Sequence, residues 1–554
     1  MSSTWAGLGQ VGLLLLALAI CYVPLGDYMA HVFTTKKHWR VERWIYRLVR
    51  VNPDSEQKWT TYAGSILGFS LAGGLFLYLL QRVQPILPWA FGHAAVIPNV
   101  AFNTAISFMT NTNWQSYVPE QTLGDSIPLV GLTLHNFVSG AAGIAVAVAL
   151  IRGFSRAQTD RLGNFWVDMT RACIRIALPM AFLFAIVLIG FGVTDSFAGA
   201  HTFTALDGTQ HTISMYPTAS QESIKELYNN GGGIYNANSA HPYENPNAWT
   251  NLIEIFLELV VPFSLTRTLG RMVGNKRQGH TLLAVMVTLW GAMLAVIWWA
   301  ELHPTGQAAI AAGAGMEGKE SRFGIAASAL FANSTTATST GAVNAAHDSL
   351  SGLGGGGTML NMMFSEMTPG GVGTGIYSIL FIAIVAVFLA GLMVGRTPEY
   401  LGKKLGKVEV TMASVGILIM PMLVLIFTGI AIVVPSSQAA MNNSGIHGFS
   451  EVLYAYTSAS NNNGSAFGGL TVTNDFFQST LGICMTLGRF VEIIAALALA
   501  GALARQKKVP ESAGTLPTTG GLFASMVGGT LVLVAAIVFI PALTLGPIAE
   551  ALSK

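Results

Sequence analysis

Four short polar segments contain the residue types that bind a dehydrated cation. They are the triplets Thr110-Asn111-Thr112, Asn229-Asn230-Gly231, Ser339-Thr340-Gly341 and Asn462-Asn463-Gly464. Backbone carbonyls and hydroxyls arranged in a ring replace the hydration shell of a monovalent ion. Glycine suits such a ring because it tolerates the positive φ that turns successive carbonyls toward one axis. The triplets therefore predict a ring-shaped cation site.

The composition of the triplets indicates which ion would bind. No carboxylate lies in any of them, and hard divalent cations usually take several carboxylate ligands. A neutral ring favours a large monovalent cation, and we expect K⁺. The alternative is that Asn, Gly, Ser and Thr only mark exposed turns. Four such turns on one face of a membrane favour the ion site instead.

The triplets also recur in a larger repeated unit. The intervals between them are 119, 110 and 123 residues, which is too long for a solenoid repeat. Segments 330–334 and 453–457 align without a gap, and each ends five residues before the first residue of its triplet. The stretches before the triplets are too short to cross a bilayer. We therefore expect four units of helix, re-entrant helix, polar turn and helix.

The composition predicts that membrane-spanning helices position these units. Hydrophobic residues make up 52% of the 554 residues and charged residues 10%, whereas soluble domains carry about 25% charged residues. This excludes a disordered, fibrous or disulfide-built protein and argues against a soluble enzyme. Ten stretches are long and apolar enough to span a bilayer. They are centred on 8–30, 61–81, 126–151, 176–194, 250–266, 280–301, 370–395, 409–434, 476–504 and 521–548.

The distribution of basic residues predicts the orientation of these spans. Alternate connections hold 7, 5, 4, 4 and 4 Lys and Arg residues, so only five of the 29 lie elsewhere. Cytoplasmic loops collect basic residues, so both termini are expected outside the cytoplasm. The connections are 31–60, 151–175, 267–279, 396–408 and 489–520, and the five other residues are Arg82, Lys225, Lys319, Arg322 and Lys554.

We expect one transmembrane domain, 1–554, of the all-α polytopic class. The pore repeats are predicted at 61–151, 172–270, 280–396 and 409–505. An extra N-terminal helix and loop occupy 1–60, and an extra C-terminal helix occupies 521–554. The polar insertion at about 195–222 is expected to form a cap or short hairpin.

Several longer segments resemble a known family. The chain resembles, along essentially its full length, the potassium-binding A subunit of the bacterial Kdp potassium-transporting ATPase. The segments that carry the resemblance are 110–117, 231–246, 338–344, 391–400 and 461–465.

The resemblance implies a fold like that of simple K⁺ channels, with the four triplets as the selectivity filter. It adds Asn113 and Gly232 to the filter, with Gln115 close by. It implies K⁺ as the transported ion, a bacterial inner membrane as the location, and a P-type ATPase B subunit with C and F subunits as partners. The lipid bilayer surrounds the chain, and no nucleic acid partner is implied.

One buried acid follows the third triplet, between two glycine-rich segments. Glu366 lies beside the second segment, and both segments, 352–358 and 368–375, are predicted to break a helix. Interrupted helices and membrane-embedded charges are common at transport sites. The family resemblance likewise implies an ion path here, with Arg396 and Arg489 near an internal gate. The alternatives are close helix packing by the glycines and ordinary anchoring by the arginines. A Glu366–arginine pair is a further hypothesis.

The first triplet differs from the others because it ends in Thr112 rather than glycine. A β-branched residue strongly disfavours positive φ. We therefore expect the carbonyl ring to be irregular at the first repeat.

Motifs for ATP hydrolysis and for enzymatic chemistry are absent from the sequence. It has no G-x-x-x-x-G-K-[ST] loop, no P-type phosphorylation motif and no H-E-x-x-H. We therefore predict no ATP site on this chain and no catalytic activity of its own. The predicted function is the K⁺-binding filter subunit of an ATP-driven importer. The alternatives are a stand-alone K⁺ channel or symporter and, far behind, an intramembrane enzyme.

Overall fold

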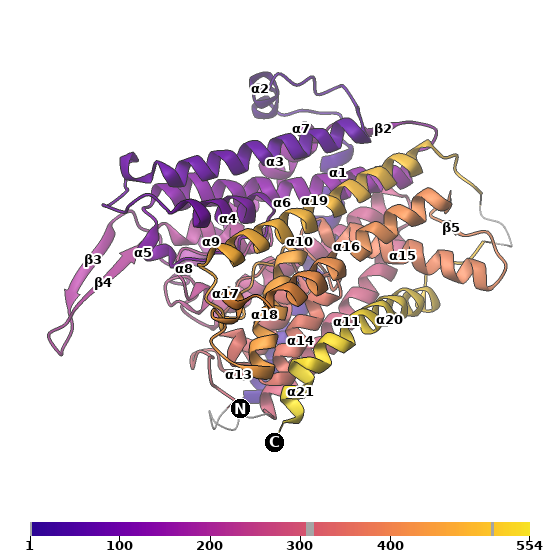
Figure 1. Ribbon diagram of the computed structural model, residues 1–554. Helices are drawn as coiled ribbons and strands as arrows, with labels where there is room; N and C mark the ends of the chain where they lie inside the picture. Colours follow the sequence, from indigo (N-terminus) through magenta and orange to yellow (C-terminus); the bar gives the residue numbers. More distant parts are fainter. Residues whose placement is uncertain (1–2, 306–314, 511–514, 554) are drawn as a thin grey trace.

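The long helices of the molecule run side by side from one end to the other (Figure 1). The computed structural model describes residues 3–305, 315–510 and 515–553. The long helices are α1 (Ser3–Thr34), α3 (Trp59–Arg82), α6 (Thr133–Ser155), α8 (Leu178–Gly190), α10 (Ala248–Met272), α11 (Lys276–Leu302), α15 (Thr374–Met393), α16 (Lys407–Ala431), α19 (Asp475–Arg505) and α20 (Gly521–Leu545). Two of them are lengthened at their N-terminal ends, α6 by the π-helical segment Ile127–Leu132, and α8 by α7 (Phe165–Arg171) and the π-helical segment Ala172–Ala177.

Nine helices within the described ranges are long and apolar enough to cross a bilayer. The tenth predicted span, 250–266, also lies in a long helix, α10, which packs along α1. Charged side chains such as Glu254, Glu258 and Arg267 make α10 less apolar than the other nine, and all three are buried in protein. Its 25 residues are still enough for a span.

Four short helices lie between long ones and lead directly to the four triplets. At 1.5 Å per residue they are about 15–26 Å long, which is less than the roughly 30 Å of a bilayer core. They are α4 (Pro98–Met109), α9 (Thr218–Leu227), α13 (Gly324–Ala337) and α18 (Gly445–Asn461). The order of long helix, short helix, triplet and long helix therefore occurs four times. The remaining short helices are α2 (Arg40–Leu48), α5 (Pro119–Thr122), α14 (Gly352–Met363), α17 (Pro435–Gln438) and α21 (Pro547–Leu552).

The strands of the described residues form three small antiparallel pairs. β3 (Gly199–Thr204) and β4 (Gln210–Met215) make an exposed hairpin that projects from the helices (Figure 1). This confirms the hairpin expected within 195–222. The other pairs are β1 (Gln57–Lys58) with β2 (Arg161–Gly163), and β5 (Glu399–Tyr400) with β6 (Lys403–Lys404).

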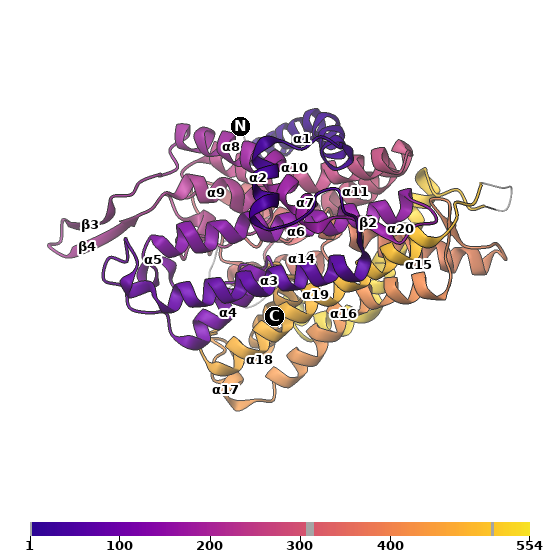
Figure 2. The same ribbon diagram turned by 90° about the horizontal axis from the view of Figure 1, so that it is seen from above.

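The two ends of the helix bundle differ in what they carry. Both chain termini lie at one end, which we call the terminal face, together with α13 and α21 (Figure 1). The opposite end, which we call the basic face, carries α2, β2 and β5 (Figure 1). Figure 2 shows α2 and β2 in the view from above. The predicted basic connections 31–60, 151–175 and 396–408 contain these three elements.

A histidine joins α21 to the fourth short helix at the terminal face, outside the membrane-spanning segments. His447 Nδ1 lies 2.9 Å from Glu550 Oε1, and its Nε2 lies 2.9 Å from Asp348 Oδ1. These two hydrogen bonds to carboxylates raise the pKa of His447 from 6.5 to about 10. The charged imidazolium therefore links α21, α18 and the segment after the third triplet.

Replacing His447 should destabilise the protein in a pH-dependent way. The pKa is raised in the folded state, so the stabilisation is fully present below about pH 6.5 and is lost as the pH rises through about 10. We expect His447→Gln to lower the free energy of unfolding by about 1–3 kcal/mol at pH 6 and by much less at pH 10.5. Thermal unfolding in detergent at both pH values measures this. The exposed His211→Gln serves as control, and an equal loss at both pH values would contradict the assignment.

Candidate functional site

The short helices end at the triplets with a common backbone pattern. In three repeats the amide of one residue, the middle one of the second and fourth triplets and Thr112 in the first repeat, bonds the carbonyl five residues earlier, as in Asn230 N to Lys225 O at 2.8 Å. We call Thr112, Asn230, Thr340 and Asn463 the middle residues from here on. The others are Thr112 N to Ser107 O and Asn463 N to Ser458 O, both at 2.9 Å. A helix that ends here also directs the negative end of its dipole toward the triplet.

Left-handed backbone conformations fix how the triplets correspond. Positive φ occurs at the residue before each middle residue in three repeats, and at the residue after it in all four. The first set is Asn111, Asn229 and Asn462, and the second is Asn113, Gly231, Gly341 and Gly464. The repeat-1 counterpart of the glycines is therefore Asn113, with φ of 56°, and not Thr112. Asparagine adopts this conformation more readily than most residues.

The irregular position of the ring therefore lies in the third repeat and not in the first. Thr112 occupies the same position as Asn230, Thr340 and Asn463, and it needs no positive φ. The exception lies in the third repeat, because Ser339 is not left-handed whereas its three counterparts are. The prediction that the first repeat breaks the pattern was wrong. It aligned Thr112 with the three glycines, whereas their counterpart is the next residue, Asn113.

The glycines let the four segments approach one another closely. A Cβ added to Gly231 would collide with Thr340 O, one on Gly341 with Asn463 O, and one on Gly464 with Thr112 O. The second segment thus lies against a carbonyl of the third, the third against one of the fourth, and the fourth against one of the first. The remaining contact is between Gly232 and the carbonyl of Asn113, which joins the second segment to the first. The segments form a closed ring.

Side-chain amides connect neighbouring segments in the same order. Asn111 Nδ2 donates to Asn229 O at 2.9 Å, and Asn229 Nδ2 donates to Thr340 Oγ1 at 2.7 Å. Asn463 Nδ2 donates to Thr338 O at 2.8 Å, and Asn462 Nδ2 donates to Thr112 Oγ1 at 2.9 Å. Every junction of the ring therefore contains at least one hydrogen bond.

One layer of carbonyls in this ring lacks a hydrogen-bond donor. The carbonyl oxygens of the four middle residues accept no hydrogen bond from the described part of the chain, and all four residues are fully buried. Buried carbonyls without a partner are costly, and cation binding is a way to satisfy them. These residues are Thr112, Asn230, Thr340 and Asn463.

Residues of α6 support the first segment, and the sequence did not single them out. Asn136 Oδ1 accepts from Asn113 Nδ2 at 2.9 Å, and Ser139 Oγ donates to Asn111 Oδ1 at 2.6 Å. Both lie on one side of a predicted span at helical spacing. The signal that could have identified them is the pair of polar residues at this spacing within an apolar span.

Two further predicted residues lie next to the ring or outside it. A Cβ on Gly232 would lie 2.8 Å from Asn113 O. Gly232 therefore lies where the second segment contacts the first. Gln115 lies in a hollow of about 630 Å³ with Trp114 and Tyr117, and its Nε2 donates to Tyr117 Oη at 3.0 Å.

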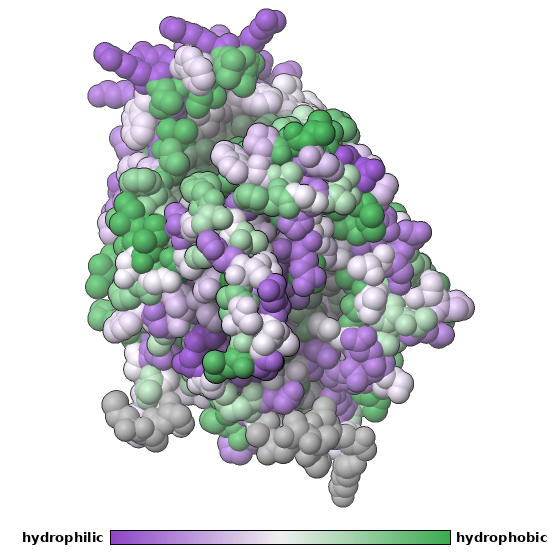
Figure 3. Space-filling model, turned by 90° about the vertical axis from the view of Figure 1, so that its left-hand side faces the viewer, coloured by the Kyte–Doolittle hydropathy of each residue, from purple (hydrophilic) through white to green (hydrophobic). Residues whose placement is uncertain are grey.

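On the side that bears the β3–β4 hairpin, hydrophilic side chains run across the middle of the surface and hydrophobic ones gather on its flanks (Figure 3).

Glu366 lies directly beside the third segment. It is 2% exposed and left-handed, in the break between α14 and α15. The hydroxyl of Ser339 donates to its carboxylate. A single buried carboxyl group thus contacts the one triplet residue that departs from the common backbone pattern.

The helix around Glu366 is broken once rather than twice. The break at 364–373 agrees with the second predicted interruption, but the glycine run 352–357 is helical within α14. The run allows close packing, since a Cβ on Gly356 would lie 3.0 Å from Pro547 Cβ and one on Gly357 would lie 2.7 Å from Ile297 Cγ1. The first predicted break was wrong, and the close-packing alternative describes these glycines.

The two arginines differ in their relation to Glu366. Arg396 is exposed beyond the end of α15, whose 20 residues span about 30 Å. Arg489 is buried on α19, and its Nη2 would lie 3.1 Å from a Cβ on Gly143. Among the described residues no ion pair joins either arginine to Glu366. A direct ion pair is therefore absent from the described residues, but Arg489 is close enough to Glu366 for a longer-range electrostatic interaction.

Comparison with known proteins finds similarity along almost the whole chain. The model of the family described as "Potassium-transporting ATPase A subunit" matches residues 12–552. A "Potassium-transporting ATPase potassium-binding subunit" from Rhodococcus opacus (strain B4) is 59% identical over 555 residues, covering 99% of each chain. A protein of the same name from Streptomyces coelicolor is 54% identical over 553 residues, covering 100% of each chain.

A solved structure shares the fold. The potassium transporter TrkH from Vibrio parahaemolyticus aligns with a TM-score of 0.52, covering 77% of this chain and 83% of that one. The sequence identity is 16%, so this likeness concerns the arrangement of helices alone.

Substituting a ring glycine should disrupt cation binding. We expect Gly464→Ala to raise the half-saturating K⁺ concentration at least about tenfold, because the methyl group displaces Thr112 O and φ is +92°. K⁺ titration of transport activity measures this. Gly445→Ala is the matched control, since Gly445 also has a positive φ but no atom within 4 Å of an added Cβ. Equal effects of the two changes would mean that backbone strain alone is responsible.

Neutralising Glu366 should alter transport without preventing assembly. Glu366→Gln keeps an acceptor for the Ser339 hydroxyl but removes a buried ionisable carboxyl group beside the ring. We expect the transport rate to change by about tenfold while the yield of assembled protein stays within about twofold. Gel filtration and cation uptake measure the two quantities. A yield that falls in parallel with transport would identify a structural residue.

Proposed function

The chain belongs to the potassium-transporting ATPase A subunit family, and we propose that it is the K⁺-binding and K⁺-selecting subunit of an ATP-driven importer. In this proposal the ring of four segments is the selectivity filter, and K⁺ is its ligand. The ion enters from outside the cytoplasm and passes to a P-type ATPase partner.

The layer of donor-free carbonyls carries this proposal. A dehydrated monovalent cation gains from its oxygen ligands what it loses in hydration, and Thr112, Asn230, Thr340 and Asn463 offer four carbonyls in a closed ring. No carboxylate belongs to the ring itself, which favours K⁺ over a hard divalent ion. Glu366, beside Ser339, is the acid that a departing ion would meet next.

The energy for import comes from another chain in this proposal. The 554 residues contain no phosphate-binding G-x-x-x-x-G-K-[ST] loop. We infer a P-type ATPase B subunit as the source, with C and F subunits completing the complex. In this proposal the protein lies in a bacterial inner membrane. The basic face is toward the cytoplasm because basic residues collect there, so both termini lie on the extracytoplasmic side.

Cation-dependent ATP hydrolysis tests this function. We expect the complex purified with its partner subunits to hydrolyse ATP in response to K⁺ at low concentration, with a weaker response to Rb⁺ and little to Na⁺. The isolated chain reconstituted in liposomes should pass no K⁺ by itself. Gly341→Ala should weaken the K⁺ response or admit other ions.

Two results would point elsewhere. If no ATPase partner co-purifies and the isolated chain conducts K⁺ in liposomes, the chain is a stand-alone channel or symporter. If K⁺, Rb⁺ and Na⁺ stimulate ATP hydrolysis equally, the ring is not the selectivity filter.

A further inference from the structure

A fully buried lysine lies on the short helix of the second repeat. Lys225 Nζ is 2.8 Å from Glu222 Oε2, 3.0 Å from Glu244 Oε2 and 3.4 Å from Glu226 Oε1. None of these four side chains is more than 2% exposed. A buried charge is stable only when it is paired and hydrogen-bonded, so the ammonium group and its partners form a fixed unit.

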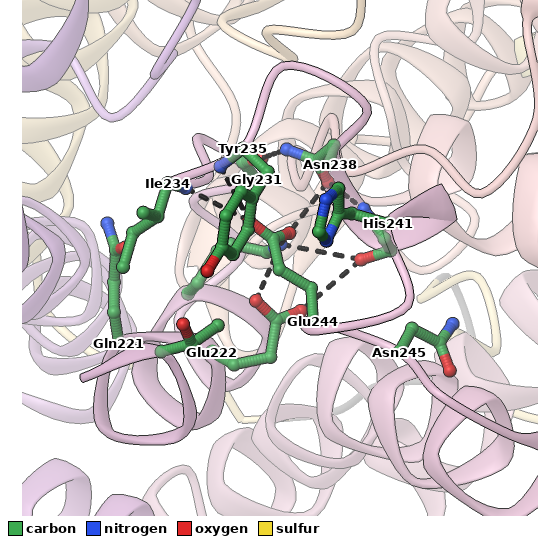
Figure 4. A network of polar contacts seen from close by, with 12 residues as sticks. Gln221, Glu222, Gly231, Ile234, Tyr235, Asn238, His241, Glu244 and Asn245 are labelled. Atoms are coloured by element: carbon green, nitrogen blue, oxygen red, sulfur yellow. Dashed lines mark hydrogen bonds and ion pairs between the residues drawn. The ribbon is translucent and has the colours of Figure 1, made fainter. Parts of the chain in front are cut away.

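This unit holds the backbone that follows the second triplet. Glu244 Oε1 accepts the amides of Ile234 and Tyr235, both at 3.0 Å. Lys225 Nζ also donates to Asn238 Oδ1 at 3.2 Å, and Asn238 Nδ2 donates to Gly231 O at 2.7 Å. Figure 4 shows Glu222, Glu244 and Asn238 converging between the helix and this loop. The chain of contacts therefore runs from the short helix to a carbonyl of the ring.

The same position in the other repeats holds only hydroxyl residues. Lys225 lies five residues before the middle residue of its triplet, where the other repeats have Ser107, Thr335 and Ser458. Ser458 Oγ accepts the amide of Gly464 at 3.1 Å, and the other two hydroxyls make no hydrogen bond within the described residues. At this position of the short helices, a charged side chain thus occurs only in the second repeat.

A consequence is visible in the carbonyls at the glycine position. Gly231 O accepts the Asn238 amide, whereas Asn113 O, Gly341 O and Gly464 O accept no hydrogen bond within the described ranges. A carbonyl that is held by an amide has less freedom to move toward the axis. Among the four carbonyls at this position, that of Gly231 is therefore the most constrained.

We propose that Lys225 and Glu244 are positioning residues that set cation discrimination by fixing the second filter segment. This rests on the proposed function, and neither residue touches the ion. A dehydrated Na⁺ is smaller than K⁺, so its coordination requires the carbonyls to move inward. The Lys225–Glu244 pair resists that movement because it anchors the amides of Ile234 and Tyr235 to a buried charge.

The test compares two acids that hold the same loop. Glu244→Gln keeps an oxygen for the two amides but removes the charge that pairs with Lys225. Glu120→Gln is the matched control, because Glu120 Oε2 accepts the amide of Asn236 at 2.9 Å and has no ion pair with Lys225 among the described residues. Both variants are purified as the complete complex, and ATP hydrolysis is titrated with K⁺, Rb⁺ and Na⁺.

The expected result is a change in discrimination rather than in maximal rate. Loss of one charged hydrogen bond corresponds to about tenfold or more in an equilibrium constant. We expect Glu244→Gln to lower the Na⁺/K⁺ ratio of half-stimulating concentrations about tenfold, with the maximal rate within about twofold. Glu120→Gln should leave the ratio unchanged. Glu244→Asp, which keeps the charge but shortens the reach, should lower the ratio by a smaller factor.

Other outcomes overturn the inference. An unchanged ratio in Glu244→Gln and Glu244→Asp, or a change of equal size in Glu120→Gln, would show that the pair does not set discrimination. If Glu244→Gln fails to assemble, Glu244→Asp alone decides by the same ratio. Failure of the proposed function is distinguishable, since the wild-type complex would then show no cation preference at all.

Discussion

The ring of four segments depends on how closely a glycine α-carbon approaches the carbonyl of the neighbouring repeat. Gly231, Gly341 and Gly464 each lie where a methyl group would strike that carbonyl. No side chain fits between the segments, so the backbone itself forms the wall of the ring. The surrounding helices must hold four separate parts of the chain at this separation. The long-range amide bonds of Asn111, Asn229, Asn462 and Asn463 serve that purpose.

The four quarters of the ring are not equivalent, because one chain supplies them all. The first uses Asn113 where the others use glycine. The second has its Gly231 carbonyl held by Asn238. The third lacks the left-handed residue before its middle position, and Ser339 contacts Glu366 instead. The ring therefore has four different local surroundings, which a ring of identical subunits does not provide.

The spans, the short helices before the triplets and the hairpin within 195–222 were readable from the sequence, because each depends on local composition and length. The register of the first triplet was not, since Thr112 and Asn113 are both polar, and only the preference of asparagine for positive φ separates them. The glycine run of α14 was read as a break because glycine is a poor helix former. Its packing partners, Pro547 and Ile297, are distant in sequence. Lys225 did leave a signal, as one of the five basic residues outside the basic connections.

The bond between Asn462 and Thr112 joins residues that are 350 positions apart. A ribosome adds about 5–20 residues per second. The fourth segment of the ring is therefore synthesised roughly 20–70 s after the first. During that interval the partner carbonyls and amides of the first quarter must be satisfied by water, lipid headgroups or the insertion machinery. Slow or paused translation between the two segments would lengthen this exposure, so the timing of synthesis is itself a constraint on how the ring assembles.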